Sequence, residues 1–352
     1  MKKTISLLLV VLLASACLFA DVSLTGELGF GYKVNFNGTV ENKDYLNLDS
    51  TYGGRFKIKL ASDYVNGELR MDAISIDGTD PSFVWNEDHS NATITTGVRQ
   101  PINAYATVKA SKLVEDTFSV SLPVAVELYV GNQSFSTSYN WAYLDPQDNE
   151  DNIKLNAERN VMPIGAAVSY DKYVTVSAWG SFTTGSQLGL VEAKVSPVDG
   201  IRVAVAYGIN QAEGTDNFQA AALVDVKTLA DLDFDLAVSG QIIANVNNFA
   251  KGAYYATVAG GYKSVSGFAE FIRKSEKNNL YAGLSYALPA EKAPTTLSAG
   301  LALVNLADVT VGASVGATTQ LANITLNVKL GVDNFKDFKN SGYIRFASYI
   351  TF

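Results

Sequence analysis

The chain has 352 residues, and its formal net charge is −8 because 27 lysines and arginines face 35 aspartates and glutamates. This acidic balance argues against nucleic-acid binding, and a hydrophobic content of 47% is too high for a disordered exported protein. One cysteine, Cys17, and one histidine, His89, are too few for a disulfide framework or a transition-metal site.

The N-terminal residues have the pattern of a secretory signal peptide. Two lysines precede an apolar run over residues 5–16, which is too short to cross a bilayer as a helix. Cleavage after Ala20 and lipidation of Cys17 are both open. The first is favoured, because a lipoprotein signal normally carries Leu near position 14, where this chain has Ala. We expect residues 1–20 to be removed and residues 21–352 to form a single domain, since no linker or composition shift divides them.

Beyond the signal, apolar side chains recur at every second position in short segments. A period of two places one face of a strand against an apolar environment. Each segment has about the ~9–11 residues that cross a hydrocarbon core as a tilted strand, and no stretch approaches the ~20 that a membrane helix requires. The clearest rows run from Val22 to Phe36, Phe118 to Val130, Ile201 to Ile209, Leu232 to Ile242 and Ile324 to Val332.

Short and long polar connections alternate between these segments. Asn66-Gly67 is a short connection with turn-forming residues, whereas residues 144–160 form a long one. Short periplasmic turns and longer external loops produce this asymmetry in membrane barrels. The pattern therefore predicts an all-β, transmembrane antiparallel β-barrel of about 16–20 strands, with about 20 or 18 favoured. The higher count takes residues 91–98 and 102–110 as separate strands.

A soluble β-sandwich is the alternative fold, since its strands also alternate. Sandwich strands bury one face in a shared core. This chain has many such apolar faces and no amphipathic helical segment to cover them, so the barrel is favoured.

The last ten residues carry the alternation to the end of the chain. Ile344, Phe346, Ile350 and Phe352 share one face, and a soluble domain seldom ends on an exposed aromatic in an unbroken strand. This ending resembles the terminal signal of Gram-negative outer-membrane β-barrel proteins, a C-terminal Phe preceded by alternating apolar residues. The signal peptide, with Cys17 near its end, resembles that of spirochaete outer-membrane proteins. The resemblance implies an outer-membrane location, insertion by the barrel-assembly machinery through Phe352, and contact with outer-membrane lipid.

Enzymatic functions lack the residues they need. Proteases and lipid hydrolases of the outer membrane require a general base, usually His, and His89 lies in a polar stretch typical of an external loop. The acidic residues of the 144–160 loop lack the glycine and terminal Glu of an EF-hand. We therefore expect no catalytic residue, no cofactor, no metal site and no enzymatic activity.

The strand faces opposite the apolar rows would line the lumen. Many of their residues are charged, and an isolated charge in a dry interior costs several kcal/mol. A barrel of about 16 or more strands is also too wide for side chains to fill, so we expect a water-filled lumen. Because closure places the last strands beside the first, the inward basic residues are expected to form one contiguous basic wall: Lys33, Arg55, Lys57, Lys59, Arg70, Lys329 and Arg345.

The longest connection, residues 144–160, is acidic. General porins, which this chain resembles in architecture, narrow their pores by folding an acidic loop inward against a basic wall. The resemblance implies a constriction formed by Asp145, Asp148, Glu150, Asp151 and Glu158. A loop that faces outward, leaving the basic wall to water and counterions, is the equal alternative. In this chain the loop follows the seventh predicted strand, whereas the familiar porins use their third loop.

Together these features predict an outer-membrane porin, a water-filled channel for passive diffusion of small hydrophilic solutes and ions. A surface-exposed adhesin or antigen that binds ligands through its external loops is the main alternative. A sugar channel would show an aromatic ladder, for which Tyr129, Tyr343 and Tyr349 are too few, and a hydrophobic-solute transporter would need a plug before Val22. The fixed basic wall favours a weak preference for anions, and a homotrimer is left open.

Overall fold

The structure is a computed structural model. It describes residues 21–42, 52–75, 83–85, 92–94, 103–132, 135–136, 139–146, 154–155, 164–183, 186–210 and 215–351. The predicted signal peptide, His89 and Phe352 lie outside the described residues.

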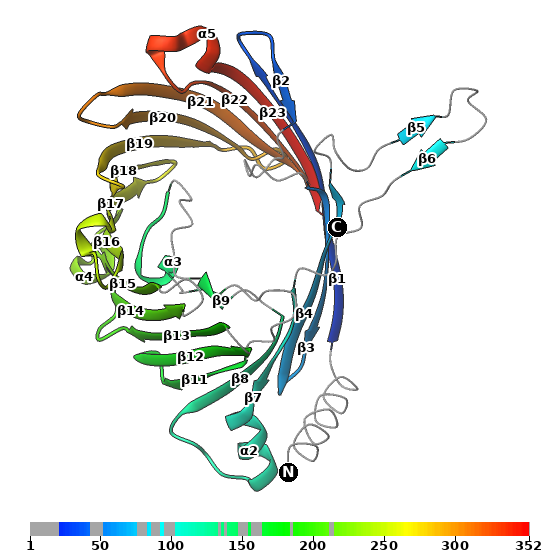
Figure 1. Cartoon of the computed structure of the whole chain (residues 1–352), viewed down its shortest axis with the longest axis vertical. Coiled ribbons are helices and arrows are strands. Elements are labelled where there is room, and N and C mark those ends of the chain that lie inside the picture. The colour runs from blue at the N-terminus through cyan, green and yellow to red at the C-terminus, as the bar shows by residue number, and fades with distance from the viewer. Residues whose placement is uncertain are drawn as a thin grey trace.

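Eighteen antiparallel strands form one closed ring (Figure 1). In chain order they are β1 (Asp21–Asn35), β3 (Tyr52–Ala61), β4 (Val65–Ser75), β7 (Asn103–Lys109), β8 (Ala125–Asn132), β11 (Ile164–Tyr170), β12 (Val174–Thr183), β13 (Ser186–Val195), β14 (Ile201–Asn210), β15 (Thr215–Asp225), β16 (Asp235–Asn245), β17 (Ala253–Tyr262), β18 (Val265–Lys274), β19 (Lys277–Leu288), β20 (Thr295–Val304), β21 (Thr310–Leu321), β22 (Ile324–Val332) and β23 (Gly342–Thr351). Each of these strands pairs with the next one in chain order, so the ring contains no crossover connection.

The ring closes where the last strand meets the first. On β1 and β23, Glu27 stands opposite Thr351 and Asn35 stands opposite Tyr343. The other edge of β1 pairs with β3. Because both edges of β1 are paired, closure leaves no open edge at the seam. The predicted closed antiparallel β-barrel is confirmed, and its eighteen strands fall within the predicted range.

Several short elements are additional to the ring. β2 (Val40–Asn42) pairs with the end of β1. With the eighteen ring strands it brings the main sheet to nineteen strands. Two small separate sheets consist of β5 (Phe83–Trp85) with β6 (Ala92–Ile94), and β9 (Phe135–Ser136) with β10 (Lys154–Leu155). The helices are α2 (Ala110–Phe118), α3 (Tyr139–Ala142), η1 (Phe249–Lys251), α4 (Val226–Ala230), η2 (Phe335–Asp337) and α5 (Phe338–Ser341). In the part of the chain that the structure describes, no helix is both long enough and apolar enough to span a membrane.

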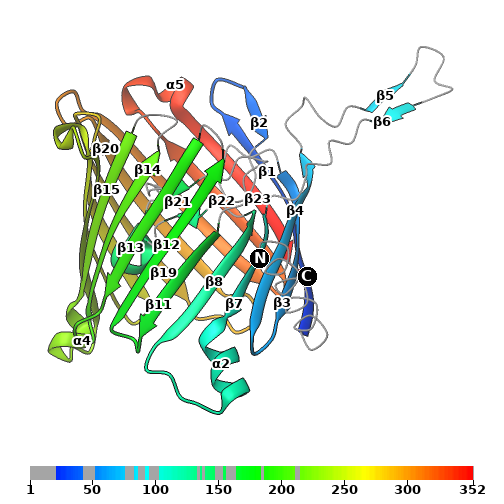
Figure 2. The same ribbon diagram turned by 60° about the horizontal axis from the view of Figure 1, so that its bottom comes forward.

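The count of twenty strands is wrong at residues 91–98. There, β6 pairs only with β5 in a hairpin that projects from the ring (Figures 1 and 2), so this segment adds no strand to the barrel. β7 instead follows β4 in the ring. The number of ring strands remains even.

Two local expectations also differ from the structure. The row from Phe118 to Val130 is a strand only from Ala125, because residues 110–118 form α2, and Ser119 ends that helix with a left-handed φ of 52°. Asn66-Gly67 lies inside β4, and the turn is formed by residues 62–64, where the Ser62 hydroxyl accepts a hydrogen bond from the Val65 amide at 2.9 Å.

The two faces of the wall differ as the alternation predicts. On β23, Ile344, Phe346 and Ile350 are exposed on the outer face, whereas Tyr343 and Arg345 are buried on the inner face. An apolar outer face suits lipid, and the charged residue of this strand, Arg345, faces the interior.

Each end of the barrel has both short and long connections (Figure 2), since residues 110–124 join β7 to β8 at one end and residues 275–276 join β18 to β19 at the other. Residues 62–64, 171–173 and 322–323 are short turns at one end, where α2 and α4 also lie. We call this the short-turn end. The 133–163 connection between β8 and β11 leaves from the opposite end.

Candidate functional site

Three basic residues stand in one row across the closure of the barrel. Lys33 on β1 is opposite Arg345 on β23, and Arg345 is opposite Lys329 on β22. The Lys33 Nζ lies 4.7 Å from the centroid of the Tyr343 ring. At this distance the positive charge is attracted to the face of the aromatic ring. Arg345 is only 6% exposed. We refer to Lys33, Arg345 and Lys329 as the seam row.

The other predicted basic positions form a second group with a different charge environment. Between β3 and β4 the register pairs Arg55 with Asp72, Lys57 with Arg70, and Lys59 with Glu68. Glu27 of β1 also stands opposite Arg55, so acidic positions are interleaved with basic ones. Glu27 and Lys33 are six positions apart on β1, roughly 20 Å along an extended strand. The register thus separates the predicted wall into the seam row and this mixed group. The side chains of Arg55 and Arg70 are outside what the structure describes.

A polar cavity lies inside the ring beside the seam row. Its volume is about 900 Å³, and Lys329 and Arg345 are among the residues that line it. The same cavity is lined by hydroxyl and amide side chains, including Ser285, Ser298, Ser314, Thr318 and Asn327. The Asn327 Nδ2 donates a hydrogen bond to the Thr318 Oγ1 at 2.7 Å. Groups of this kind can replace part of the hydration shell of a polar solute.

Part of the long β8–β11 connection enters the barrel. Residues 139–146, which include α3, lie within the ring of strands when the barrel is viewed along its axis (Figure 1). Pro146 at their end lines the polar cavity together with Arg345. We call residues 139–146 the lumen segment.

The lumen segment lies along one register row of the inner wall. That row crosses six strands from β14 to β19 and consists of Arg202, Leu223, Ser239, Thr257, Glu270 and Tyr281. The Ser239 Oγ accepts a hydrogen bond from the Leu144 amide at 2.9 Å. The adjacent row contains Ala204 and Ala221, whose small side chains pack with Ala142. Small residues let the segment approach the wall closely, and polar partners then satisfy its backbone.

Tyr143 is the largest buried side chain of the lumen segment. Its side chain is 2% exposed, and its ring packs edge-on against Tyr255 with centroids 5.8 Å apart. Its hydroxyl donates a hydrogen bond to Glu270 Oε1 and lies 2.9 Å from the Thr257 Oγ1. Burial, and then the hydrogen bond to Glu270, raise the pKa of Tyr143 far above its usual range. The phenol therefore stays protonated and remains a donor.

Trp141 forms a second attachment of the segment to the wall. The Arg202 guanidinium donates to the Trp141 carbonyl at 3.4 Å. The Trp141 ring also lies near two cations, since Arg202 Cζ is 6.0 Å and Lys194 Nζ is 5.9 Å from its centroid. Cations over an indole face add attraction at this distance. Trp141 and Tyr143 thus fix the segment at two points on the inner wall.

The acidic residues predicted for the constriction are only partly within the described structure. Asp145 belongs to the lumen segment and is half-buried, whereas Asp148, Glu150, Asp151 and Glu158 lie outside the described residues. The role of these acids stays a prediction.

Sequence reasoning missed the residues that attach the segment. The predicted constriction consists of the acidic residues of the loop, whereas the attachment uses the apolar run Trp141 to Leu144 and the inward Glu270. That apolar run inside an otherwise polar connection is the signal that could have indicated an internal position.

The barrel is similar to solved structures that cover nearly its whole length. OccAB2 from Acinetobacter baumannii matches with a TM-score of 0.55 and 8% identity over 95% of this chain and 98% of that chain. A mutant of the Rh. blastica porin matches with a TM-score of 0.46 and 10% identity, over 94% of this chain and 100% of that chain. No family model matches the chain, and no curated protein matches it in sequence. The closed eighteen-strand ring and the OccAB2 match together show that the chain has a closed antiparallel β-barrel fold similar to that of OccAB2.

Proposed function

We propose that this protein is an outer-membrane porin through which small hydrophilic solutes and ions diffuse passively. The observation that carries the proposal is the polar cavity of about 900 Å³ inside the ring, which Lys329 and Arg345 share with serine, threonine and asparagine side chains. A polar interior behind an apolar outer face offers water and ions a path that lipid does not.

Export and assembly complete this proposal. The predicted signal peptide of residues 1–20 would direct the chain across the inner membrane. The barrel-assembly machinery would then recognise the C-terminal strand that ends at Phe352. β23 is the strand that pairs with β1, so the strand carrying the signal is also the one that seals the ring.

The lumen segment is the proposed constriction. It projects from the wall into the ring, and its contacts with Ser239, Thr257 and Glu270 hold it there. A segment anchored by buried hydrogen bonds reduces the open cross-section, so solutes would be selected by size. The acidic residues Asp145, Asp148, Glu150, Asp151 and Glu158 would add negative charge near this point.

The seam row is the proposed source of a weak anion preference. Its three cations stand side by side in register, with one acid, Glu41 of β2, opposite Lys33 at the end of the row. Arg55 of the mixed group instead stands between two acids, Glu27 and Asp72. Opposite charges in one row cancel much of their field at a distance, and like charges add. The basic residues near the polar cavity therefore outweigh those of β3.

Single-channel recording tests the proposal directly. The refolded protein is added to a planar lipid bilayer in KCl, and discrete, ohmic conductance steps are expected. The test solutes are uncharged polyethylene glycols of increasing size, which should stop reducing the conductance once they exceed the constriction. A bilayer that stays silent, with protein shown to be inserted, would contradict the porin function.

A surface adhesin or antigen is the second candidate. β5 and β6 pair with each other outside the ring and project from the barrel (Figures 1 and 2), as a ligand-binding hairpin would. Deleting residues 83–94 separates the two functions. A porin would keep its conductance, and an adhesin would lose binding to its ligand surface.

A further inference from the structure

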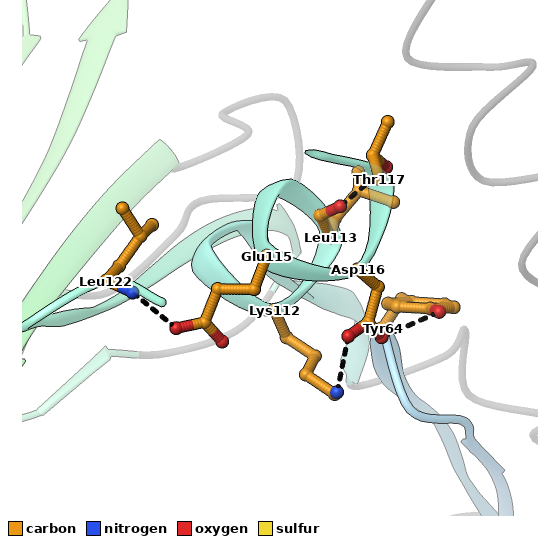
Figure 3. Close-up of polar contacts among 7 residues, drawn as sticks. All are labelled: Tyr64, Lys112, Leu113, Glu115, Asp116, Thr117 and Leu122. Atoms are coloured by element: carbon orange, nitrogen blue, oxygen red, sulfur yellow. Dashed lines mark hydrogen bonds and ion pairs between the residues drawn. The ribbon is translucent and has the colours of Figure 1, made fainter. Parts of the chain in front are cut away.

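Helix α2 is attached to the barrel by its polar face. The helix follows β7 at the short-turn end (Figure 2). Its Asp116 Oδ2 accepts a hydrogen bond from the Tyr64 hydroxyl at 2.9 Å, and its Oδ1 lies 2.7 Å from the Lys112 Nζ (Figure 3). Glu115 Oε1 accepts from the Leu122 amide at 2.8 Å. The charged residues of the helix are thus directed to the chain's own turn and connection.

Further contacts fix where the helix lies. The Lys109 amide donates to the Tyr64 carbonyl at 2.8 Å, and the Lys109 Nζ donates to the Ser62 carbonyl at 3.1 Å. Ser111 is buried, and its hydroxyl accepts from the Val126 amide of β8 at 3.0 Å. The helix is therefore joined to the β3–β4 turn on one side and to β8 on the other.

The apolar face of α2 points away from the protein. Val114 and Phe118 are four residues apart, so they lie on the same side of the helix. Val114 is 39% exposed and Phe118 is 69% exposed. An amphipathic helix on a soluble protein turns its apolar side to the core and its charges to water. In α2, Phe118 is instead more exposed than the charged side chains of Lys112 and Asp116, which are 48% and 38% exposed.

The neighbouring outer wall shows what surrounds this face. On β8 and β11, Leu128 and Val168 are exposed on the apolar outer face. β11 then ends in a turn with two exposed tyrosines, Tyr170 and Tyr173. Tyrosines at strand ends mark the level where a membrane barrel meets the lipid headgroups. Helix α2 lies at the same end and contacts β8, so its exposed apolar residues Val114 and Phe118 lie near the end of the lipid-facing band.

We propose that α2 is an interfacial helix that lies in the headgroup boundary of the periplasmic leaflet, with Val114 and Phe118 buried in lipid. The occupant of the exposed face is the bilayer itself. Amphipathic helices bury an apolar side at this depth when the other side is polar. Here the polar side is held by Tyr64 and the 119–124 connection, so the helix acts as a fixed anchor beneath β7 and β8.

Fluorescent labelling in vesicles tests the proposal. The full chain carries Cys17→Ser, so that one introduced cysteine is the only thiol. Phe118→Cys and Val114→Cys are labelled with NBD on the apolar face, and Lys112→Cys is labelled on the polar face as the matched control. Leu128→Cys reports the lipid-facing wall. The labelled proteins are refolded into phosphatidylethanolamine and phosphatidylglycerol vesicles with brominated acyl chains, which quench fluorophores that enter the bilayer.

We expect labels at positions 118 and 114 to be quenched nearly as strongly as the label at position 128, with blue-shifted emission, while the label at position 112 stays in water. Quenching at 128 but not at 118 or 114 would overturn the inference and leave the barrel's membrane placement intact. Absence of quenching at all four positions would instead contradict the membrane placement. A blue shift at 118 without lipid quenching, together with 118-to-118 crosslinks, would assign the face to a second copy and overturn the lipid proposal.

Discussion

Lys33 and Arg345 stand opposite each other across the strand pair that closes the barrel, and Lys329 stands on the far side of Arg345. Like charges directly opposite on one sheet face repel each other. Water and counterions in the lumen relieve that repulsion, because the interaction weakens as the effective dielectric rises. The strand that seals the fold therefore also concentrates positive charge at one side of the interior.

Replacing the seam row should change ion selectivity. In the triple variant Lys33→Gln, Arg345→Gln and Lys329→Gln, the reversal potential under a KCl gradient should move toward cations. The shift should be larger in dilute salt, because the screening length grows from about 8 Å at physiological ionic strength to about 30 Å at 0.01 M.

The mixed group supplies the matched control for that measurement. Arg55→Gln, Lys57→Gln and Lys59→Gln remove the same charge, but Glu27, Glu68 and Asp72 stand beside them in register. A smaller shift is expected from this variant. If it shifted the potential more than the seam variant, the mixed group would be the selectivity element.

Tyr143→Phe should loosen the lumen segment. The change removes the hydroxyl that links the segment to Thr257 and Glu270. A hydrogen bond to a charged group contributes about 1.5–3 kcal/mol, so detached states should become more populated. Single-channel records should show higher or fluctuating conductance. Tyr173→Phe, at an exposed turn, is the control and should behave as the wild type. A quiet, unchanged record for Tyr143→Phe would mean that other contacts hold the segment.

The two faces of β22 should respond differently to the same charge. Val328 is exposed on the outer face at the middle of the strand, whereas Asn327 lines the polar cavity. Val328→Arg should lower the free energy of unfolding by about 2–4 kcal/mol, as expected for Arg near the bilayer midplane. Asn327→Arg should cost much less. Urea titration of the protein refolded into lipid vesicles measures both. Equal costs would place both residues in one environment and contradict a wet lumen.

The period of two was a sufficient guide wherever one face meets an apolar environment and the other a polar one. On β22 and β23 this contrast recurs along most of the strand, so the faces and the closure could be predicted. The same rule failed at Phe118, Val120 and Leu122, because α2 and its connection also place apolar residues two apart. The prediction of a ring strand at residues 91–98 was wrong for a related reason. Local alternation does not indicate which strand is the partner, and β6 pairs with β5 outside the ring.

The internal position of the lumen segment could not be read from local pattern. Tyr143 is 127 positions from Glu270 and 114 from Thr257, and the wall beneath Ala142 is shaped by alanines on two other strands. Register brings these residues together only after the whole ring has formed. The division of the basic wall into two groups could not be predicted for the same reason. The positions of Glu27 and Asp72 on either side of Arg55 depend on the register of three strands.

Acid should weaken the attachment of α2. The hydrogen bond from Lys112, and then that from Tyr64, hold the pKa of Asp116 below its ordinary value of 3.8. A lowered folded-state pKa contributes stability that is fully present above the ordinary value and is lost as the pH falls through the lowered one. Protection of the α2 amides against hydrogen exchange, corrected for intrinsic rates, should therefore be constant near neutrality and decline below roughly pH 4. The effect should be small, because exposed ion pairs contribute little. Asp116→Asn keeps an acceptor for the Tyr64 hydroxyl but has no charge to titrate, so its protection should be lower at neutral pH and flat across this window. The same acid-dependent decline in Asp116→Asn would show that another group controls the helix.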